Sequence, residues 1–311
     1  MTIEKNLVNT TARISEPPEG KGTSGKDRKP VWLKVKLPSD PNFFRVSEVL
    51  KAHRLHTICG SARCPNIGEC WSNRTATFLI LGDTCTRACS FCAVAKGTPS
   101  APDESEPGRV AGVVRSLGLE YAVITSVTRD DLADGGATIF ARTIRAVREG
   151  SPRTKIEVLV PDFDGNVEAL DVVLEAGPDI LNHNLETTES LYTGIRRPAG
   201  NYRRSLEVLA AAKRRKALTK SGLMIGLGER QEDILQTLSD LRRAGCDLLT
   251  IGQYLRPSPV NAPVEKYYSP REFDELRTIA LDFGFAGVVA GPLVRSSFHA
   301  DKLYASAAGR T

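Results

Sequence analysis

The sequence predicts an α/β protein in which parallel strands alternate with helices to form a partial barrel. Six short apolar or β-branched runs, typical of buried strands, lie at residues 76–81, 121–125, 155–160, 179–182, 222–227 and 248–254. Helical periodicity occupies the segments between them. The chain left after a cysteine-rich region is too short for eight strand–helix units. We therefore expect a (β/α)6 arrangement with right-handed crossovers, curled but not closed.

The predicted helices repeat apolar residues at intervals of three and four. Examples are Val110, Val113, Val114 and Leu117, then Phe140, Ile144 and Val147, and then Ile234, Leu238 and Leu241. We therefore divide the chain into four segments: a flexible lead-in at 1–30, an N-terminal extension at 31–75, the barrel at 76–285, and a C-terminal extension at 286–311. Chemistry in such sheets gathers at the carboxyl ends of the strands, and a cysteine-rich loop follows the first run.

Composition limits the classes of protein that fit. The chain has 311 residues, 41% of them hydrophobic, and a net charge of +5. This mild basic excess suits an acidic protein partner and does not call for nucleic acid. The longest apolar stretch is too short to cross a bilayer, so we expect a cytoplasmic protein with no membrane partner. The polar, acid-containing first thirty residues resemble neither a signal peptide nor a transit peptide.

The seven cysteines indicate metal binding rather than disulfides, because no export signal is expected. Six of them fall between Cys59 and Cys92, while Cys246 stands alone. We interpret Cys246 as a small buried apolar residue. The clustering of the other six is the most informative feature of the sequence.

The second cysteine group follows the first predicted strand as Cys85-Thr-Arg-Ala-Cys89-Ser-Phe-Cys92. Three thiolates on a cubane iron–sulfur cluster leave one iron open, and an open iron can chelate a small molecule through an amine and a carboxylate. This motif, including Phe91, resembles that of the radical S-adenosylmethionine (SAM) superfamily. Structural zinc would prefer two paired hooks and four ligands. A ferredoxin-type carrier would need a fourth thiolate and no barrel.

The first group, Cys59-Gly-Ser-Ala-Arg-Cys64-Pro-Asn-Ile-Gly-Glu-Cys70, again supplies three thiolates and implies a second cluster. With its neighbours CPNIGECW and ATFLILGDTCTRACSFC, it resembles the lipoyl synthase family. The likeness continues through TSVTRDDLADGGA, NHNLET, IRRPAGNY, LMIGLGE and GPLVRSSFHA, from about residue 31 to residue 300.

The resemblance implies roles for particular residues. Cys85, Cys89 and Cys92 would hold the [4Fe-4S] cluster that cleaves SAM, and Cys59, Cys64 and Cys70 would hold an auxiliary [4Fe-4S] cluster. Its fourth ligand would be Ser297, with Ser296 as the neighbouring alternative, in the motif Arg295-Ser296-Ser297-Phe298, where the family usually has tyrosine in place of Phe298. Without the resemblance, Arg-Ser-Ser would be interpreted as a polar turn or helix start.

The family's reaction is the insertion of sulfur at carbons 6 and 8 of an octanoyl chain on a carrier lysine, with the auxiliary cluster as sulfur source. The implied partners are octanoylated carrier domains (the E2 subunits of dehydrogenase complexes and the glycine cleavage H protein), an electron donor such as ferredoxin or flavodoxin, and an iron–sulfur carrier that rebuilds the spent cluster.

Weaker patterns suggest where SAM binds. Gly135-Gly136 could let the backbone approach its methionine portion, although Ala137 stands where many relatives have an acid, so a plain loop is the alternative. Asn182, Asn184 and Glu186 could hold its ribose or amine. Arg196, with Arg197, could pair with a carboxylate or lie at the surface. We interpret His183 as a hydrogen-bonded structural residue.

Two other patterns carry less weight. Gly226-Leu-Gly228 lacks the third glycine of a dinucleotide loop. The basic run 213–216 fits a solvated helix end better than a nucleic-acid site. Two other functions remain open: another radical sulfur-inserting enzyme, such as a biotin synthase relative, and an iron–sulfur scaffold without catalysis.

Overall fold

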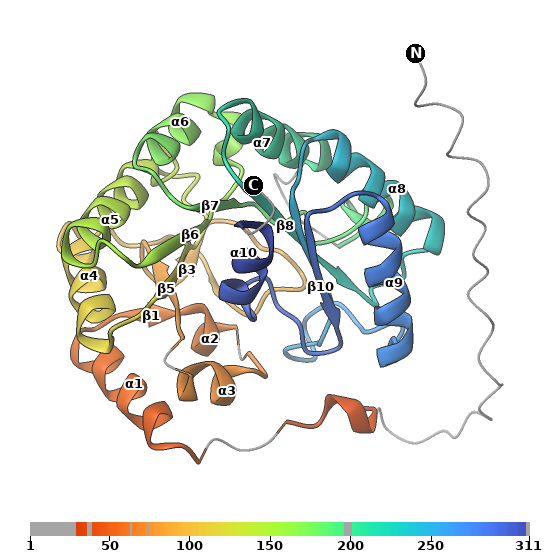
Figure 1. Ribbon diagram of the computed structural model, residues 1–311, viewed down its shortest axis with the longest axis horizontal. Helices are drawn as coiled ribbons and strands as arrows, with labels where there is room; N and C mark the ends of the chain where they lie inside the picture. The colour runs from red at the N-terminus through yellow and green to blue at the C-terminus, as the bar shows by residue number, and fades with distance from the viewer. Residues whose placement is uncertain (1–28, 36–38, 63, 74, 196–200, 309–311) are drawn as a thin grey trace.

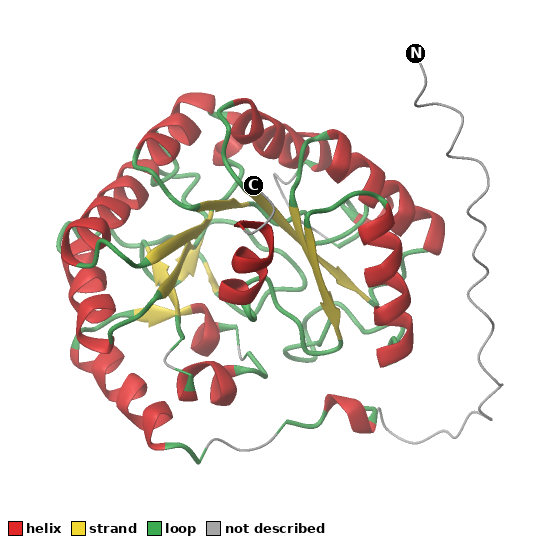
Figure 2. Ribbon diagram, viewed as in Figure 1, coloured by secondary structure: helices red, strands yellow, loops and turns green. Residues whose placement is uncertain are grey.

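The computed structural model describes residues 29–35, 39–62, 64–73, 75–195 and 201–308. Eight strands form one sheet, ordered β1-β2-β5-β6-β7-β8-β9-β10, in which all neighbours are parallel except β1 and β2. Figures 1 and 2 show this sheet curled inside a ring of helices. The strands are β1 (His56–Thr57), β2 (Thr77–Ile80), β5 (Tyr121–Ser126), β6 (Lys155–Leu159), β7 (Ile180–Asn182), β8 (Thr219–Ile225), β9 (Leu248–Gln253) and β10 (Gly287–Gly291).

The predicted partial barrel is confirmed, with one more parallel strand than the sequence analysis placed. All six predicted strands are present, although β8 begins three residues earlier than expected. The additional strand, β10, pairs with β9 in the register Gly287 to Leu248. It lies in the segment predicted as a C-terminal extension, so residues 286–311 supply an edge of the sheet. The described strands pair in an open order that ends at β1 and β10.

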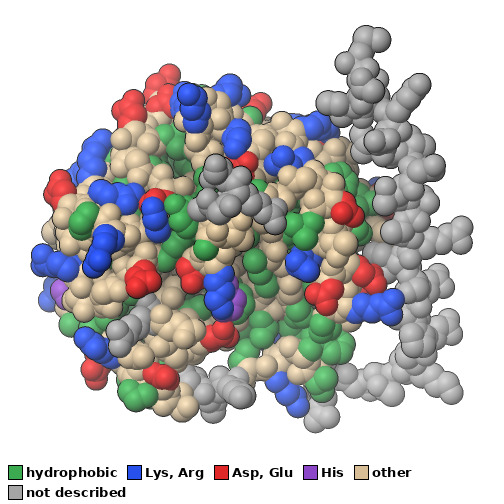
Figure 3. Space-filling view, in the orientation of Figure 1, with side chains coloured by type: hydrophobic (Ala, Val, Ile, Leu, Met, Phe, Trp, Pro, Cys, Tyr) green, Lys and Arg blue, Asp and Glu red, His purple; other side chains and the backbone are tan. Residues whose placement is uncertain are grey.

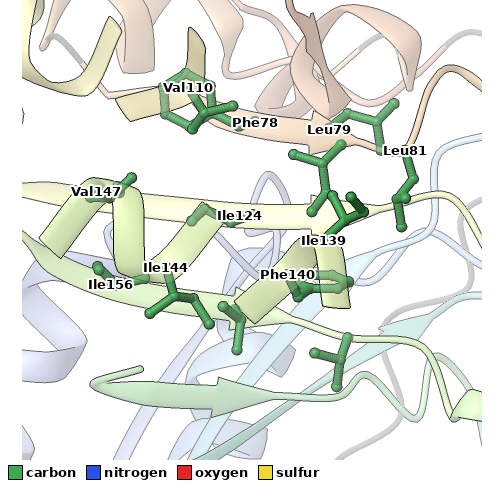
Figure 4. Close-up of a cluster of buried hydrophobic side chains, with 14 of the residues drawn as sticks. Phe78, Leu79, Leu81, Val110, Ile124, Ile139, Phe140, Ile144, Val147 and Ile156 are labelled. Carbon is green, nitrogen blue, oxygen red and sulfur yellow. The ribbon is translucent and has the colours of Figure 1, made fainter. Parts of the chain in front are cut away.

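Helices cover the outer face of the sheet (Figure 1). In α5, Phe140 and Ile144 lie on the buried side and belong to the same apolar cluster as Ile124 of β5 and Ile156 of β6 (Figure 4). Burying each such side chain stabilises the fold by roughly 1.5–3 kcal/mol. The helices are α4 (Glu106–Leu117), α5 (Ala137–Gly150), α6 (Val167–Glu175), α7 (Tyr202–Arg214), α8 (Gln231–Arg243) and α9 (Pro270–Asp282).

The predicted N-terminal extension packs beside the first strands. Its elements are η1 (Val31–Leu33), α1 (Pro41–Ala52), α2 (Ile58–Ser61) and α3 (Ile67–Ser72). Val46 and Leu50 of α1 are buried in the main core cluster. Asn66 ties this segment to the far end of the chain, because its amide nitrogen donates to the Leu293 carbonyl oxygen at 2.6 Å. Most of the predicted lead-in, residues 1–28, lies outside the described residues.

The last helix, α10 (Ala300–Ala308), covers the amino-terminal ends of the strands. Ala300 and Leu303 form a buried cluster with residues at or near the starts of three strands, Tyr121, Ile180 and Leu248. Figure 3 views this face, where acidic and basic side chains are interspersed around the rim. The opposite end of the barrel, at the carboxyl ends of the strands, is left for the site. No described helix is long and apolar enough to span a bilayer.

A cluster of buried polar side chains lies inside the barrel. The Lys220 ammonium donates to both carboxylate oxygens of Glu157 at 2.9 Å, and neither side chain is exposed. Tyr121 and Asn182 also donate to Glu157, at 2.7 and 2.9 Å. Such a buried pair is tolerated because the charges are matched and hydrogen bonded.

Candidate active site

A cavity of about 490 Å³ opens at the carboxyl ends of the strands. Strand ends supply part of its wall, including Thr125 and Ser126 of β5, Leu159 of β6 and Met224 of β8. The N-terminal extension and the C-terminal segment supply the rest. Both cysteine groups reach this cavity, since Cys59 and Cys64 line it together with the second group.

The second cysteine group stands on the loop that follows β2. Cys85 ends β3 (Thr84–Cys85), which pairs with β4 (Ala95–Lys96), and Gly97 N–H donates to the Cys85 carbonyl oxygen at 3.0 Å. Cys85, Cys89, Cys92 and Phe91 all line the cavity. The sequence motif therefore becomes a short closed loop whose three thiols reach one space.

Arg87, between Cys85 and Cys89, fastens this loop to the segments that follow β5 and β6. Its guanidinium forms a two-point ion pair with Asp130, at 2.7 and 2.8 Å, and contacts Asp162 at 2.8 Å. Both carboxylates raise the arginine pKa enough to outweigh burial, which would lower it. Burial opposes ionisation of Asp162, but the hydrogen bond and charge of Arg87 leave its pKa below the usual value. The sequence analysis did not single out this group, because its members are far apart in the chain.

Asn261 holds the same loop from the other side. Its amide nitrogen donates to the carbonyl oxygens of Ser90 and Cys92, at 3.0 and 3.1 Å, and its oxygen accepts from the Ser258 hydroxyl at 2.7 Å. Asn261 is 6% exposed. The segment after β9 therefore braces the cysteine loop.

The first cysteine group meets the C-terminal motif. Cys59 lies in α2, Cys70 in α3, and Cys64 between them. A second, smaller cavity is lined by all three cysteines together with Ser297 and other residues of both segments. Ser296 lines the larger cavity but not the smaller one. The hydrogen bond between Asn66 and Leu293 brings the two segments together at this point.

The chemistry of these donors fits an iron–sulfur cluster. No disulfide joins the cysteines in the described part of the chain. Burial raises the pKa of Cys59 and of Cys64, and burial with the two neighbouring thiols raises the pKa of Cys70 to about 12. Loading a metal group here must therefore release protons. Three thiols and one hydroxyl match the four ligand positions of a cubane.

A single metal ion is a poorer match. No set of three or more His, Cys, Asp or Glu side chains among residues 29–308, apart from the undescribed gaps, is arranged to hold one ion.

Arg295 lines both cavities and was not among the predicted site residues. Its Nη1 donates to the carbonyl oxygens of Gln253 and Val294, at 3.2 and 2.7 Å. Burial lowers its pKa, while the nearby Cys64 and Glu186 act in the opposite direction. A partly buried cation therefore stands between the first cysteine group and the rest of the cavity.

The predicted SAM contacts are only partly brought together. Glu186, Asn184 and His183 line the cavity, and Asn184 donates to the Glu186 carboxylate at 3.1 Å. His183 is buried, with Nδ1 hydrogen bonded to the Val160 carbonyl oxygen at 2.8 Å, as a structural histidine would be. Arg196 and Arg197 lie outside the described residues.

Asn182, Gly135 and Gly136 do not reach the cavity wall. Asn182 points into the barrel, and its amide nitrogen donates to the buried Glu157 at 2.9 Å rather than facing the cavity. Gly136 has φ +90°, and a Cβ there would lie 2.2 Å from Leu81 Cδ1. The glycine pair therefore permits close packing at the start of α5.

Three minor predictions can be placed as well. Cys246 is fully buried in an apolar cluster, as predicted. Lys213 and Arg214 lie in the last turn of α7, and Lys213 forms an ion pair with Asp247. The backbone N–H groups of Gly226 and Leu227 donate to the Glu229 carboxylate, so this turn already has an internal anion.

The fold and the three-thiol loop define the class of protein. A model of the radical SAM superfamily matches residues 79–241. The fold is similar to the crystal structure of methylornithine synthase, with a TM-score of 0.51, 14% identity, and coverage of 80% of this chain and 82% of that one. It is also similar to the FeFe-hydrogenase maturase HydG from Carboxydothermus hydrogenoformans, with a TM-score of 0.56, 14% identity, and coverage of 74% and 56%. This is a radical SAM enzyme, a class that uses a [4Fe-4S] cluster and SAM.

The family within this class follows from closer relatives. A model of the N-terminal domain of lipoyl synthase matches residues 8–64. The lipoyl synthase of Rubrobacter xylanophilus is 51% identical over 92% of this chain and 92% of its own. That of Symbiobacterium thermophilum is 54% identical over 91% and 89%. The chain belongs to the lipoyl synthase family.

Proposed function

We propose that the protein is a lipoyl synthase, which inserts two sulfur atoms at C6 and C8 of an octanoyl group on a carrier lysine. The observation that carries this proposal is that both cysteine groups open onto one cavity. A substrate chain held there can meet both groups without leaving the protein. An electron carrier or a cluster scaffold has no need of such a shared space.

The six cysteines have distinct proposed roles. Cys85, Cys89 and Cys92 would hold the SAM-cleaving cluster, and Cys59, Cys64 and Cys70 with Ser297 would hold the auxiliary [4Fe-4S] cluster. When bound, the first cluster supplies the electron that cleaves SAM, and the second supplies sulfur. Ser297 is favoured over Ser296 because it shares the smaller cavity with the three cysteines.

The cavity wall suits the substrate. Apolar side chains such as Leu79, Val127, Val160 and Met224 line it, as an octanoyl chain requires. Glu186, which lines the cavity, would accept a hydrogen bond from the amine or ribose of SAM. Burial of these groups keeps water away from reactive carbon atoms.

The remaining proposals concern the cell. The enzyme would act in the cytoplasm on octanoylated carrier domains, receive electrons from a ferredoxin or flavodoxin, and have its auxiliary cluster rebuilt by an iron–sulfur carrier. The segment 31–75 would serve as the auxiliary-cluster domain and 76–285 as the radical domain.

Anaerobic reconstitution tests the function directly. The protein should bind about eight irons and convert an octanoyl-lysyl peptide to the dithiol product with SAM and dithionite, as followed by mass spectrometry. Cys64→Ala should still form 5′-deoxyadenosine but insert no sulfur, while Cys246→Ala, which changes a buried thiol outside the cavity, should do both. Product from Cys64→Ala would refute the sulfur-donor role, and the absence of 5′-deoxyadenosine from the unaltered protein would favour a scaffold.

A further inference from the structure

The exposed large apolar side chains of the described residues are concentrated on two segments that also contribute to the cavity wall. Six large hydrophobic residues are exposed in the described part of the chain, and four of them lie on two short segments, 29–35 and 255–261. They are Val31, Trp32, Val35 and Val260, exposed by 70%, 39%, 49% and 92%. Single exposed apolar residues are ordinary on protein surfaces, but a concentration of them marks an interaction site.

Both segments border the mouth of the cavity. Lys29 lines the cavity from the first segment, and Leu255, Arg256 and Pro257 line it from the second. The first segment, which contains η1, lies at the lower edge of the molecule in Figure 1. We call the exposed side chains of these two segments the mouth surface.

The charge of the mouth surface has one sign. Segments 29–35 and 255–261 contain Lys29, Lys34 and Arg256, all exposed, and no aspartate or glutamate. Arg256 donates to the Asn261 carbonyl oxygen at 2.9 Å within its own loop. None of the three cations forms an ion pair with a carboxylate of the described residues. No described carboxylate therefore neutralises these cations.

We infer that the mouth surface docks the acidic face of a small folded carrier domain, which presents its octanoyl-lysine to the cavity. This inference rests on the proposed function. Tryptophan is enriched among residues that dominate binding energy, and Trp32 shares its segment with two exposed valines and two exposed lysines. Rim cations would steer an acidic domain toward the mouth and make the association dependent on salt. The loop 255–261 also braces the cysteine loop through Asn261, so docking occurs beside the reacting groups.

Binding measurements with two substrates test the inference. The dissociation constant of the reconstituted protein is measured for an octanoylated carrier domain and for a short octanoyl-lysyl peptide. Trp32→Ala should weaken binding of the domain about tenfold, and Val260→Glu and Lys34→Glu about fivefold each. Lys34→Glu should also reduce the salt dependence. None of these side chains lines the cavity, so binding of the peptide should stay within about twofold.

Matched controls lie elsewhere on the surface. Val167→Glu, on α6, alters an exposed valine outside the cavity wall, and Lys302→Glu, on α10, reverses a charge at the other end of the barrel. Both should bind the domain as the unaltered protein does. Should Trp32→Ala fail to fold, Val260→Glu at its highly exposed position still decides the question.

Several outcomes would overturn the inference. One is unchanged domain binding in all three variants, and another is an equal loss of peptide binding, which would place these side chains in the cavity rather than the docking surface. A third is a change of oligomeric state on gel filtration, which would make the surface a contact between copies of this chain. If the unaltered protein binds the domain but never forms dithiol product, the proposed function fails while the docking surface stands.

Discussion

Replacing Arg87 with methionine removes the guanidinium that fastens the cysteine loop and keeps most of the side-chain volume. Its side chain is 4% exposed, and it faces Asp162, which is fully buried, and Asp130, which is 32% exposed. Leaving a buried carboxylate without its partner costs about 3–5 kcal/mol. Asp130 can be hydrated and adds little, and Arg204 Nη1, 3.9 Å from Asp162, recovers part of the loss. We expect a net destabilisation of about 3 kcal/mol.

Thermal unfolding of the anaerobically reconstituted protein measures this effect. For a chain of this size, the expected loss lowers Tm by about 5 °C. Arg203→Met is the matched control, because the ion pair of Arg203 with Glu189 is exposed, by 63% and 48% for the two side chains, and should shift Tm very little. The double variant Arg87→Met with Asp162→Asn should recover about 1 kcal/mol or more, because the buried charge is then gone.

Two results would refute this reasoning. One is an equal fall in Tm for Arg87→Met and Arg203→Met. The other is a double variant whose loss equals the sum of the two single losses, which would mean that the residues do not act as a unit.

The same pair predicts a pH dependence. Because the folded-state pKa of Asp162 lies below its ordinary value of 3.8, its stabilisation is complete above that value and is lost as pH falls through the lower, folded-state pKa. The stability difference between the unaltered protein and Arg87→Met should therefore be constant near neutrality and shrink only in acid. A difference that shrinks between pH 6 and 8 would point to another group.

The remaining predictions concern the cluster ligand, a glycine and the buried ion pair. Ser297→Ala should lower the iron content and abolish the dithiol product, while 5′-deoxyadenosine still forms. Ser296→Ala, the control, should have normal iron content and form both products. Normal iron content and dithiol product in Ser297→Ala would exclude Ser297 as a ligand. Gly136→Ala should lower the free energy of unfolding, measured by urea titration, by about 2 kcal/mol, because Gly136 has a positive φ and an added Cβ would collide with Leu81. Gly112→Ala, on α4, is the control: its added Cβ meets no atom within 4 Å, so it should stabilise the protein slightly. Equal effects of the two substitutions would contradict the packing argument. Lys220→Met should cost about 3–5 kcal/mol by leaving its carboxylate partner buried and unpaired, and a loss below about 1 kcal/mol in denaturant unfolding would show that the carboxylate is easily protonated.

Much of the site was predictable because its signals are local. The spacing of Cys85, Cys89 and Cys92 and that of Cys59, Cys64 and Cys70 can be observed directly in the sequence, and three ligands per group follow from counting. Six strands were found because buried parallel strands are short apolar runs. The β10 strand was missed because its run is short and bounded by Gly287 and Gly291, which weaken a strand pattern.

Other features depended on contacts between distant parts of the chain. Sequence alone could not show that Arg87 meets Asp130, 43 residues away, or that Asn261 hydrogen bonds to the backbone of Cys92. A charged or amide residue within a loop gives no indication of its partner until the strands are curled. For the same reason, Asn182 was predicted at the site although its amide nitrogen donates to Glu157, a buried residue that does not line the cavity.

The sequence by itself determined the kinds of ligand, their number in each group and the alternation of strands and helices, because these follow from residue type and spacing along the chain. Only the tertiary structure decided that both cysteine groups and Ser297 face shared space, and which polar residues line it. Closing long loops to bring Cys59, Cys92 and Ser297 together depends on strand order, pleat direction and packing of the whole barrel, none of which is encoded in a local pattern.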